Sequence, residues 1–251
     1  MRQAAAHSLI VARRNLLQLP RTPQLLVFTA VQPVMFVLLF SYVFGGAIRI
    51  PGLKYIDFLI PGIVVQTVAF GTMTTAVGLA EDLSKGIVDR FRSLPISRVA
   101  VIAGRVIADA ARTAFTVLLI IAVGSLIGFR FHAGPAAAVG VVAIGILFGF
   151  AFSWVAVNIG LRVGNPESAQ AASFLWLFPL TFASSAFVPP ETMPRLLRAF
   201  AEANPITKVI DALRVLVLGG PAARAVLTAL AWIVGILFVF APLAVRRFRR
   251  M

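Results

Sequence analysis

Apolar residues gather into long uninterrupted stretches, and polar residues are confined to the short segments between them. Six stretches are long enough to cross the roughly 30 Å hydrocarbon layer of a membrane, which takes about 20 helical residues. They cover residues 25–44, 56–80, 106–128, 134–161, 168–189 and 224–245. Pro33, Pro61 and Pro179 lie within spans, which membrane helices tolerate when neighbouring groups satisfy the freed carbonyls. The pattern predicts an all-α integral membrane protein with six spans, forming a single domain over residues 1–251.

The composition supports a membrane location. Hydrophobic residues make up 60% of the chain and charged residues 13%, and the mean hydropathy is +0.96. Soluble domains are nearer half apolar and a quarter charged. A soluble core of this length cannot bury so much apolar surface, so the excess is expected to face lipid. The first span begins only near Leu25, which is too late for a cleaved signal peptide, so the N-terminus is expected to remain on the protein.

The basic residues predict the orientation. Lys and Arg number 23 against 9 Asp and Glu, a net charge of +14. With the N-terminus inside, the cytoplasmic segments hold 14 of the 23 basic residues, so both termini are expected in the cytoplasm. These residues lie beside apolar runs rather than on a soluble face, which argues against nucleic-acid binding. The preference for Arg over Lys is typical of a GC-rich bacterial genome and favours the bacterial cytoplasmic membrane.

Small residues recur at a spacing that brings helices close together. Gly145 and Gly149 form a GxxxG pair, Gly140 precedes them, and Gly160 and Gly164 repeat the spacing. Such pairs let helix backbones approach one another. They indicate packing and carry no functional information.

The segment between the second and third spans, residues 81–98, is amphipathic. On a helix its apolar residues Leu83, Ile87, Phe91 and Leu94 share one face. Glu81–Lys85 and Lys85–Asp89 are pairs of opposite charge on the other face, and Pro95 is expected to end the helix. One interpretation places this helix on lipid headgroups. The mixed charge favours the alternative, a protein partner.

This segment resembles the cytoplasmic loop of ABC-2 type permeases, especially drug exporters of the daunorubicin-resistance type. The resemblance rests on an acidic pair, a glycine, an Asp-Arg and an Arg-Ser-Leu-Pro run followed by Ser-Arg: Glu81, Asp82, Gly86, Asp89, Arg90, Arg92, Ser93, Leu94, Pro95, Ser97 and Arg98. The continuation is also similar, with Gly104, Arg105, Asp109 and Arg112. The resemblance implies a coupling helix that docks on a separate ATP-binding subunit, and ATP and Mg²⁺ would be bound by that subunit. It also implies an N-terminal interfacial helix within residues 1–22.

A second resemblance lies between the fifth and sixth spans. Pro194, Asn204, Pro205, Thr207, Arg214 and Gly219 stand where such permeases carry a pair of short outer helices that dip back toward the membrane. Asn204 followed by Pro205 is a good helix start. The helix that follows has an apolar face, formed by Val209, Ile210, Leu213 and Val217, and an opposite face with Lys208, Asp211 and Arg214. We expect an outer gate at Asn204, Pro205 and Arg214; a surface loop without a gating role is the alternative.

The sequence lacks the residue patterns that nucleotide binding, ion coupling, metal binding and catalysis would require. Neither Lys54, Lys85 nor Lys208 lies in a phosphate-binding loop, so this chain is expected to hold no nucleotide, and ATP hydrolysis belongs to a partner. Ion coupling usually needs carboxylates deep in the spans. Asp57 is expected at an outer end beside Lys54, and Asp109 is expected to be neutralised by Arg105 and Arg112. With no cysteine and two distant histidines, neither a metal site nor an enzyme is predicted.

The resulting hypothesis is a permease that works as a homo- or heterodimer with two ATPase subunits. Its substrate path lies between protomers and is lined by Gln66, Thr67 and Thr74 of the second span and by Phe174, Trp176, Phe178, Thr181, Phe182 and Ser185 of the fifth. The aromatic side chains favour a hydrophobic or amphipathic, drug-like cargo. One alternative is export of a lipid, glycan or other envelope component. Another is a scaffold or channel subunit without ATP coupling.

Overall fold

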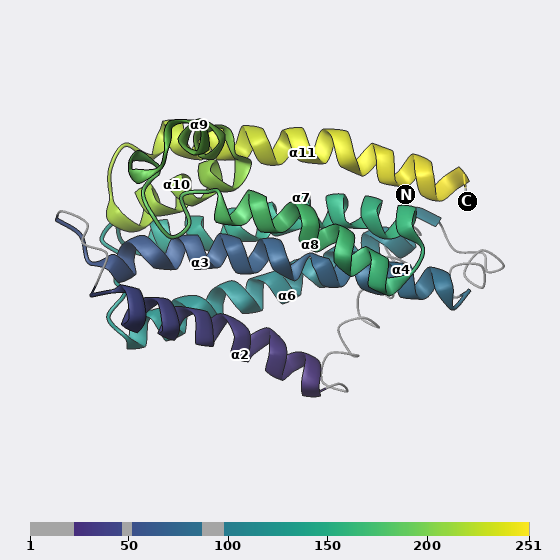
Figure 1. The fold of residues 1–251 in the computed structure, drawn as a ribbon, viewed down its shortest axis with the longest axis horizontal. Coiled ribbons are helices and arrows are strands. Elements are labelled where there is room, and N and C mark those ends of the chain that lie inside the picture. Colours follow the sequence, from purple (N-terminus) through teal and green to yellow (C-terminus); the bar gives the residue numbers. More distant parts are fainter. Residues whose placement is uncertain (1–22, 47–51, 87–97, 251) are drawn as a thin grey trace.

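The computed structural model describes residues 23–46, 52–86 and 98–250, and the regular elements of these residues are helices (Figure 1). The predicted all-α class is therefore confirmed for the described chain. The predicted interfacial helix, residues 1–22, lies outside it. The elements are α2 (Pro23–Leu39), the π-helix η2 (Phe40–Phe44), α3 (Tyr55–Gly71), α4 (Met73–Ser84), α6 (Arg98–Leu126), α7 (Pro135–Val163), α8 (Pro166–Phe182), the 3-10 turn η3 (Pro190–Thr192), α9 (Arg195–Ala203), α10 (Pro205–Leu218) and α11 (Ala222–Arg250).

Four helical stretches are long and apolar enough to cross a membrane: 55–84, 104–126, 135–163 and 222–248. A shorter apolar helix covers Ala30–Val43. These match five of the six predicted spans in position, four of them at full length. The fifth predicted span, 168–189, is helical only as α8, which ends at Phe182. Six membrane crossings therefore remain a prediction.

The early end of α8 is explained by hydrogen bonds from Asn204. The side-chain amide of Asn204 donates to the carbonyl oxygens of Leu180, at 2.6 Å, and Ala183, at 3.1 Å. These bonds satisfy carbonyls at the end of α8 and let the chain turn away from the helix axis. The sequence-based boundary at residue 189 is wrong because this partner lies more than twenty residues further along the chain.

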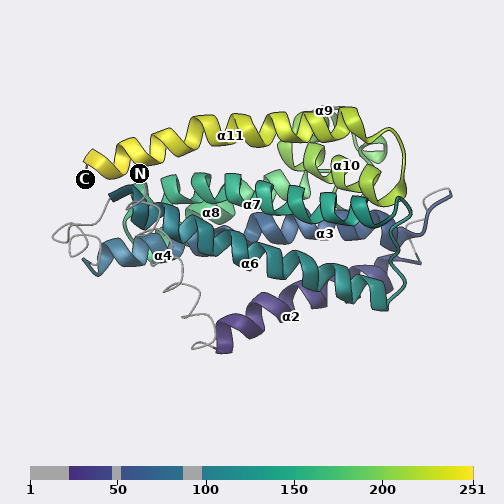
Figure 2. The ribbon, with the colours of Figure 1, turned by 180° about the vertical axis from the view of Figure 1, so that it is seen from behind.

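Helix α7 lies at the centre of the bundle, in contact with α3, α4, α6, α8, α10 and α11 (Figures 1 and 2). Its glycines make these contacts close. A methyl group at Gly149 would lie 2.8 Å from the Val68 side chain and 2.9 Å from that of Thr113, and one at Gly160 would lie 2.6 Å from the carbonyl oxygen of Ala76. The predicted packing role is confirmed for these glycines. Gly164 differs: it ends α7 in the left-handed conformation, with φ 75°.

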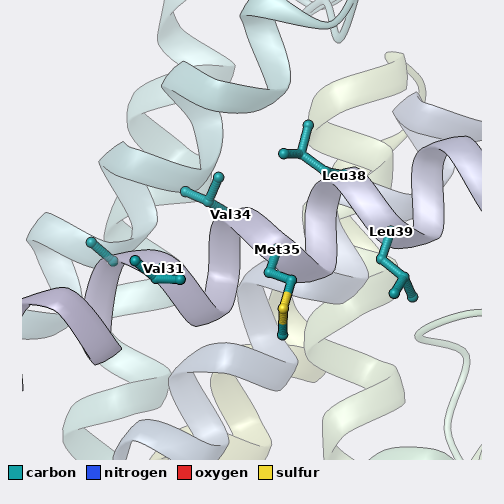
Figure 3. A pocket seen from close by; sticks show the side chains of 6 residues that line it. Val31, Val34, Met35, Leu38 and Leu39 are labelled. Atoms are coloured by element: carbon teal, nitrogen blue, oxygen red, sulfur yellow. The ribbon is translucent and has the colours of Figure 1, made fainter.

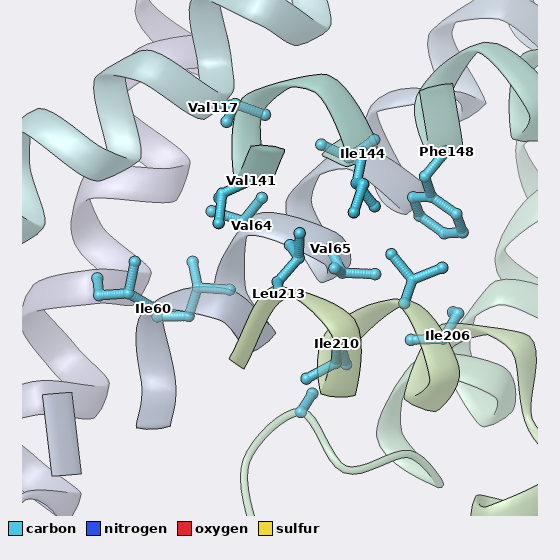
Figure 4. Packing of buried hydrophobic residues seen from close by; sticks show 14 of the residues in the cluster. Ile60, Val64, Val65, Val117, Val141, Ile144, Phe148, Ile206, Ile210 and Leu213 are labelled. Atoms are coloured by element: carbon cyan, nitrogen blue, oxygen red, sulfur yellow. The ribbon is translucent and has the colours of Figure 1, made fainter. Parts of the chain in front are cut away.

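The main apolar core lies toward one end of the bundle and joins α3, α6, α7 and α10 (Figure 4). Helix α10 is short, yet the apolar face predicted for it is fully buried in this core. The residues that meet there are Ile60, Val64 and Val65 of α3, Val117 of α6, Val141, Ile144 and Phe148 of α7, and Ile206, Ile210 and Leu213 of α10. Helix α10 is thus an integral part of the bundle.

The two ends of the bundle differ. The end of α4, the start of α6 and the C-terminal end of α11 lie together at one end, and α9 and α10 lie at the other (Figures 1 and 2). Large apolar side chains point outward along α11, including Leu227, Val234 and Phe238. A surface of this kind is suited to lipid contact. The end of α4, the start of α6 and the end of α11, which lie together, belong to the segments that the distribution of basic residues assigns to the cytoplasm.

We expect Gly160→Ala to lower the free energy of unfolding by about 1–3 kcal/mol, because its methyl group would press on the backbone of α4. Gly235→Ala on α11 is the matched control, because nothing lies within 4 Å of the added carbon and alanine favours the helix. Thermal melting in detergent, followed by size-exclusion chromatography, measures both. Equal melting temperatures for the two variants would contradict the close α4–α7 contact.

Candidate functional site

Helices α3 and α4 belong to one predicted span but are separated by a break at Gly71 and Thr72. The Thr72 hydroxyl donates to the carbonyl oxygen of Ala69 at 2.6 Å, and the Thr74 hydroxyl donates to that of Gly71 at 2.8 Å. Short hydroxyl side chains that bond nearby carbonyls compete with regular helix hydrogen bonding. The Gly71 carbonyl also accepts a hydrogen bond from Arg112 of α6 at 2.9 Å. An arginine of another helix therefore satisfies the backbone at this break.

Arg112 belongs to a cluster of polar groups between α4 and α6. It forms an ion pair of 3.0 Å with Asp109, which also accepts a hydrogen bond from the Thr75 hydroxyl. One turn closer to the end of α4, Arg105 of α6 pairs with Asp82 at 2.9 Å. The predicted neutralisation of Asp109 by two arginines is therefore wrong for Arg105. Its guanidinium lies against Gly78, where a methyl group would be 2.6 Å from Nη2, and this leaves it within reach of Asp82.

The predicted coupling segment is described only at its two edges. Glu81 and Lys85 form the expected i,i+4 ion pair, and this hydrogen bond raises the pKa of Lys85 above its ordinary value. Helix α4 ends at Ser84, and Gly86 has φ +65°, the left-handed conformation common at helix ends. The prediction of one helix running through Gly86 is therefore wrong at this point. Arg98 is the first residue of α6, and only its backbone is described. The other predicted coupling residues, Asp89, Arg90, Arg92, Leu94, Pro95 and Ser97, lie outside the described residues.

The predicted substrate-path residues are distributed over α3, α4 and the α8 region with different exposure. Gln66, Thr181 and Ser185 are buried, Thr67 is half-buried, and Thr74 and Phe178 are exposed. The Gln66 side-chain oxygen and the Thr181 hydroxyl are buried and have no hydrogen-bond partner among the described residues. A hollow of about 430 Å³ lies elsewhere, along α2, and is lined by the apolar residues Ala30, Val31, Val34, Met35, Leu38 and Leu39 (Figure 3). None of the predicted path residues lines this hollow.

Phe178 is part of a continuous row of phenylalanine rings, which we call the aromatic row. Adjacent ring centroids in the row are 4.4 to 6.2 Å apart, within the range of aromatic pairing. The row links α2, α8 and α3, and three of its rings are more than two-fifths exposed on α8. Its members, in spatial order, are Phe36, Phe40, Phe187, Phe182, Phe178, Phe174 and Phe70. Trp176 lies apart from the row and packs on Phe152 of α7.

At the other end of the bundle, Asn204 performs the predicted capping role. Its side-chain oxygen accepts a hydrogen bond from the backbone N–H of Ile206 at 2.9 Å, and Pro205 is the first residue of α10. The amide group of the same side chain holds the end of α8. Asn204 therefore fastens two helices at once, while only its capping role was predictable from the sequence.

Arg214 is buried, with 8% of its surface exposed, although the sequence placed it on the polar face of α10. Its burial was not predictable, because the carbonyl groups that it bonds are distant in the sequence. Its Nε donates to the carbonyl oxygen of Phe58 at 3.1 Å, and its Nη2 donates to the carbonyl oxygens of Ser185 and Ala186. The guanidinium carbon lies 3.5 Å from the centroid of the Phe58 ring. Arg214 thus joins α10 to α3 and to the turn after α8.

Asp211 completes this cluster. Its carboxylate lies 3.7 Å from the guanidinium of Arg214 and accepts a hydrogen bond from the Ser185 hydroxyl at 3.1 Å. The i,i+3 spacing of Asp211 and Arg214 was the signal in the sequence that the arginine has a partner within the protein. The predicted outer gate is therefore a tightly bonded junction in this structure.

Asp57 lies in the first turn of α3, close to Lys54 as expected, and contacts the loop between α6 and α7. It is 2% exposed, accepts a hydrogen bond from the backbone N–H of Arg130 at 3.1 Å, and lies 3.9 Å from Nε2 of His132. Lys54 touches it only through the backbone, as the acceptor of the Asp57 N–H. Asp57 therefore fastens the α6–α7 loop to the start of α3.

The chain is similar to known transport proteins over most of its length. A family profile described as "ABC-2 type transporter" matches residues 7–218. The chain is 36% identical over 236 residues to the daunorubicin resistance ABC transporter permease protein DrrB1 of Streptomyces coeruleorubidus, covering 94% of this chain and 83% of that protein. It is 25% identical over 242 residues to the probable doxorubicin resistance permease DrrC of Mycobacterium tuberculosis, covering 96% and 87%. It is 27% identical over 213 residues to the putative transport permease ycf38 of Cyanophora paradoxa, covering 82% and 72%.

We expect Arg214→Ala to lower the free energy of unfolding by about 3 kcal/mol or more. The substitution removes the hydrogen-bond donor of three carbonyl oxygens and the ion-pair partner of the Asp211 carboxylate. The corresponding fall in melting temperature in detergent is about 6–12 °C. Arg224→Ala is the control, since Arg224 is an exposed arginine near the same end of the bundle. If both variants melt together, the buried arginine is not a structural junction.

Proposed function

Because the chain belongs to the ABC-2 type transporter family, as a membrane-spanning permease subunit without a catalytic domain, we propose that it exports a hydrophobic or amphipathic, drug-like compound from the cytoplasm. Energy comes from ATP hydrolysis on a separate ATPase subunit. The observation that carries this proposal is the 36% identity over 94% of the chain to a permease named for daunorubicin resistance. The second relative, named for doxorubicin resistance, supports the same class of cargo.

The ATPase subunit contacts residues 81–98 in this proposal. Glu81, Asp82 and Lys85 lie at the end of α4, and Arg98 begins α6, so the segment between them joins two long helices at one end of the bundle (Figures 1 and 2). The exposed Glu81–Lys85 pair presents both signs of charge, which favours a protein partner over a lipid surface. The contact residues within the segment are Gly86, Asp89, Arg90, Arg92, Leu94, Pro95, Ser97 and Arg98.

The cargo moves between two permease copies, as a homo- or heterodimer. Gln66, Thr67 and Thr74 contribute polar groups, and Phe178, Thr181 and Ser185 contribute the facing surface. The exposed rings of the aromatic row support an apolar or amphipathic cargo, because aromatic faces bind such compounds with little directional requirement. The buried oxygen atoms of Gln66 and Thr181, which have no hydrogen-bond partner among the described residues, add hydrogen-bonding capacity.

The membrane is the bacterial cytoplasmic membrane, crossed six times, with both termini inside. Support comes from charge and position together. The exposed Arg246 and Arg250 at the end of α11 lie at the same end of the bundle as the end of α4. Helices α9 and α10, at the opposite end, form the outer segment and its gate at Asn204, Pro205 and Arg214. Basic residues concentrate on the cytoplasmic side of membrane proteins.

The first test is purification of the tagged chain from native membranes in mild detergent. We expect a stoichiometric ATP-binding subunit to accompany it, and we expect Glu81→Ala combined with Arg90→Ala to reduce that subunit by about tenfold, because contact charges at the interface are lost. Arg198→Ala is the matched control, since it removes one partner of an exposed i,i+4 pair on α9 at the other end of the bundle. Absence of any ATPase, even after cross-linking, would favour the scaffold or channel alternative.

The second test concerns the cargo. The purified complex is reconstituted in vesicles, and ATP-dependent uptake of daunorubicin into them is followed by its fluorescence. We expect uptake that stops when ATP is omitted, because the free energy for transport comes from nucleotide binding and hydrolysis. ATP-dependent movement of labelled lipid without daunorubicin uptake would instead identify an envelope exporter.

A further inference from the structure

One polar face of the α3–α4 segment lies opposite one polar face of α6. On the first, Gly71, Thr75, Gly78 and Asp82 follow at spacings of four, three and four residues, which is one side of a helix. On the second, Arg105, Asp109 and Arg112 follow at spacings of four and three. The contacts pair them in antiparallel order: Asp82 with Arg105, Thr75 with Asp109, and Gly71 with Arg112. We call these three contacts the polar ties.

The charges of the polar ties are balanced by two ion pairs, one between the helices and one within α6. Asp82 of α4 and Arg105 of α6 are 2.9 Å apart, and Asp109 and Arg112, both of α6, are 3.0 Å apart. All four side chains are at least two-thirds buried. Moving α4 away from α6 would separate Asp82 from Arg105 and leave two largely buried charges without a partner, and it would also break the two hydrogen bonds of the polar ties. The polar ties therefore oppose a change in the distance between α4 and α6.

Apolar packing on α7 also supports both helices. Helix α4 packs closely on α7, where a methyl group at Gly160 would meet the carbonyl of Ala76, and it also packs on α8. Helix α6 packs on α7 and α3, and Leu79 of α4 and Val106 of α6 belong to one buried apolar cluster. Between α4 and α6, the long arginine side chains bridge the space, and Gly78 leaves room for the guanidinium of Arg105. The polar ties are thus the described hydrogen bonds and ion pair between the two helices that flank residues 87–97, beside this shared apolar cluster.

We propose that Asp82, Arg105, Asp109 and Arg112 are positioning residues that keep α4 and α6 at a fixed separation, so that both helices move as one body when the ATPase acts on the segment between them. This inference rests on the proposed function. A force applied to that segment then moves α4 and α6 together relative to the α3–α4 break and does not separate the two helices. Arg112 lies at this break, because it bonds the last carbonyl of α3.

The experiment measures the separation directly, so it needs no knowledge of the cargo. The chain contains no cysteine, so two introduced cysteines are its only sites for spin labels. Ser84→Cys on α4 and Ile107→Cys on α6 are suitable, since both side chains are exposed. The labelled permease, in complex with its ATPase in vesicles of phosphatidylethanolamine and phosphatidylglycerol, is studied by double electron–electron resonance with and without vanadate-trapped ADP.

We expect one narrow distance distribution that is the same in both nucleotide states. In Arg105→Ala we expect a broader distribution and a nucleotide-dependent shift of the mean distance by about 2 Å or more, the size of typical helix movements in switching proteins. The charge exchange Asp82→Arg with Arg105→Asp should restore the narrow, unchanging distribution. A purely structural role would not make the distance depend on nucleotide.

Two further variants keep the test decisive. Arg198→Ala removes one partner of an exposed ion pair on α9 and should behave like the labelled parent. Asp82→Asn preserves side-chain size and replaces Arg105→Ala if that variant does not insert. A distance that changes with nucleotide in the parent, or one that stays fixed in Arg105→Ala and Asp82→Asn, overturns the inference while leaving the proposed function intact. If no ATPase accompanies the permease, the proposed function fails first and the inference fails with it.

Discussion

The structure depends on one constraint: a backbone carbonyl freed inside a membrane protein has no water to bond to and must find a donor within the protein. Among the described residues, an arginine from another helix donates to such carbonyls at the interruption between α3 and α4 and at the turn after α8. Arg112 bonds the carbonyl of Gly71 where α3 gives way to α4. Arg214 bonds the carbonyls of Ser185 and Ala186 just after α8. Each arginine also forms an ion pair with the aspartate three residues before it, and this aspartate balances its charge.

Packing differs between the end of the bundle that contains Arg214 and the opposite end. Around Arg214, the large apolar core joins α3, α7 and α10, and Asn204 and Asp57 add hydrogen bonds to loops and helix ends. Toward the other end, the buried apolar clusters are smaller and the contact between α4 and α6 is polar. Close-packed cores resist deformation. The end that carries the predicted ATPase contact has the smaller apolar clusters, and its helices α4 and α6 are held to each other by polar contacts.

Features set by residues near one another in the chain were predictable from the sequence. These include the Asn204–Pro205 helix start, the Glu81–Lys85 pair, the buried face of α10 and the close packing at Gly149, because each follows from helical periodicity or capping chemistry. The burial of Arg214 and the partner of Arg105 were not predictable, because their partners come from other helices. Gly86 was placed inside a helix because apolar spacing continues across it, and periodicity carries no information on a left-handed backbone. The end of α8 was missed for the same reason as Arg214.

The hydrogen-bond donors that hold the end of α8 are synthesised later than α8 itself. The carbonyls of Leu180 and Ala183 accept hydrogen bonds from Asn204, and those of Ser185 and Ala186 accept them from Arg214. Arg214 follows Ser185 by 29 residues. At the usual rate of about 5–20 residues per second, that interval is about 1.5–6 s. The end of α8, a helix of 17 residues, therefore obtains the donors for its carbonyls only after Asn204 and Arg214 have been synthesised.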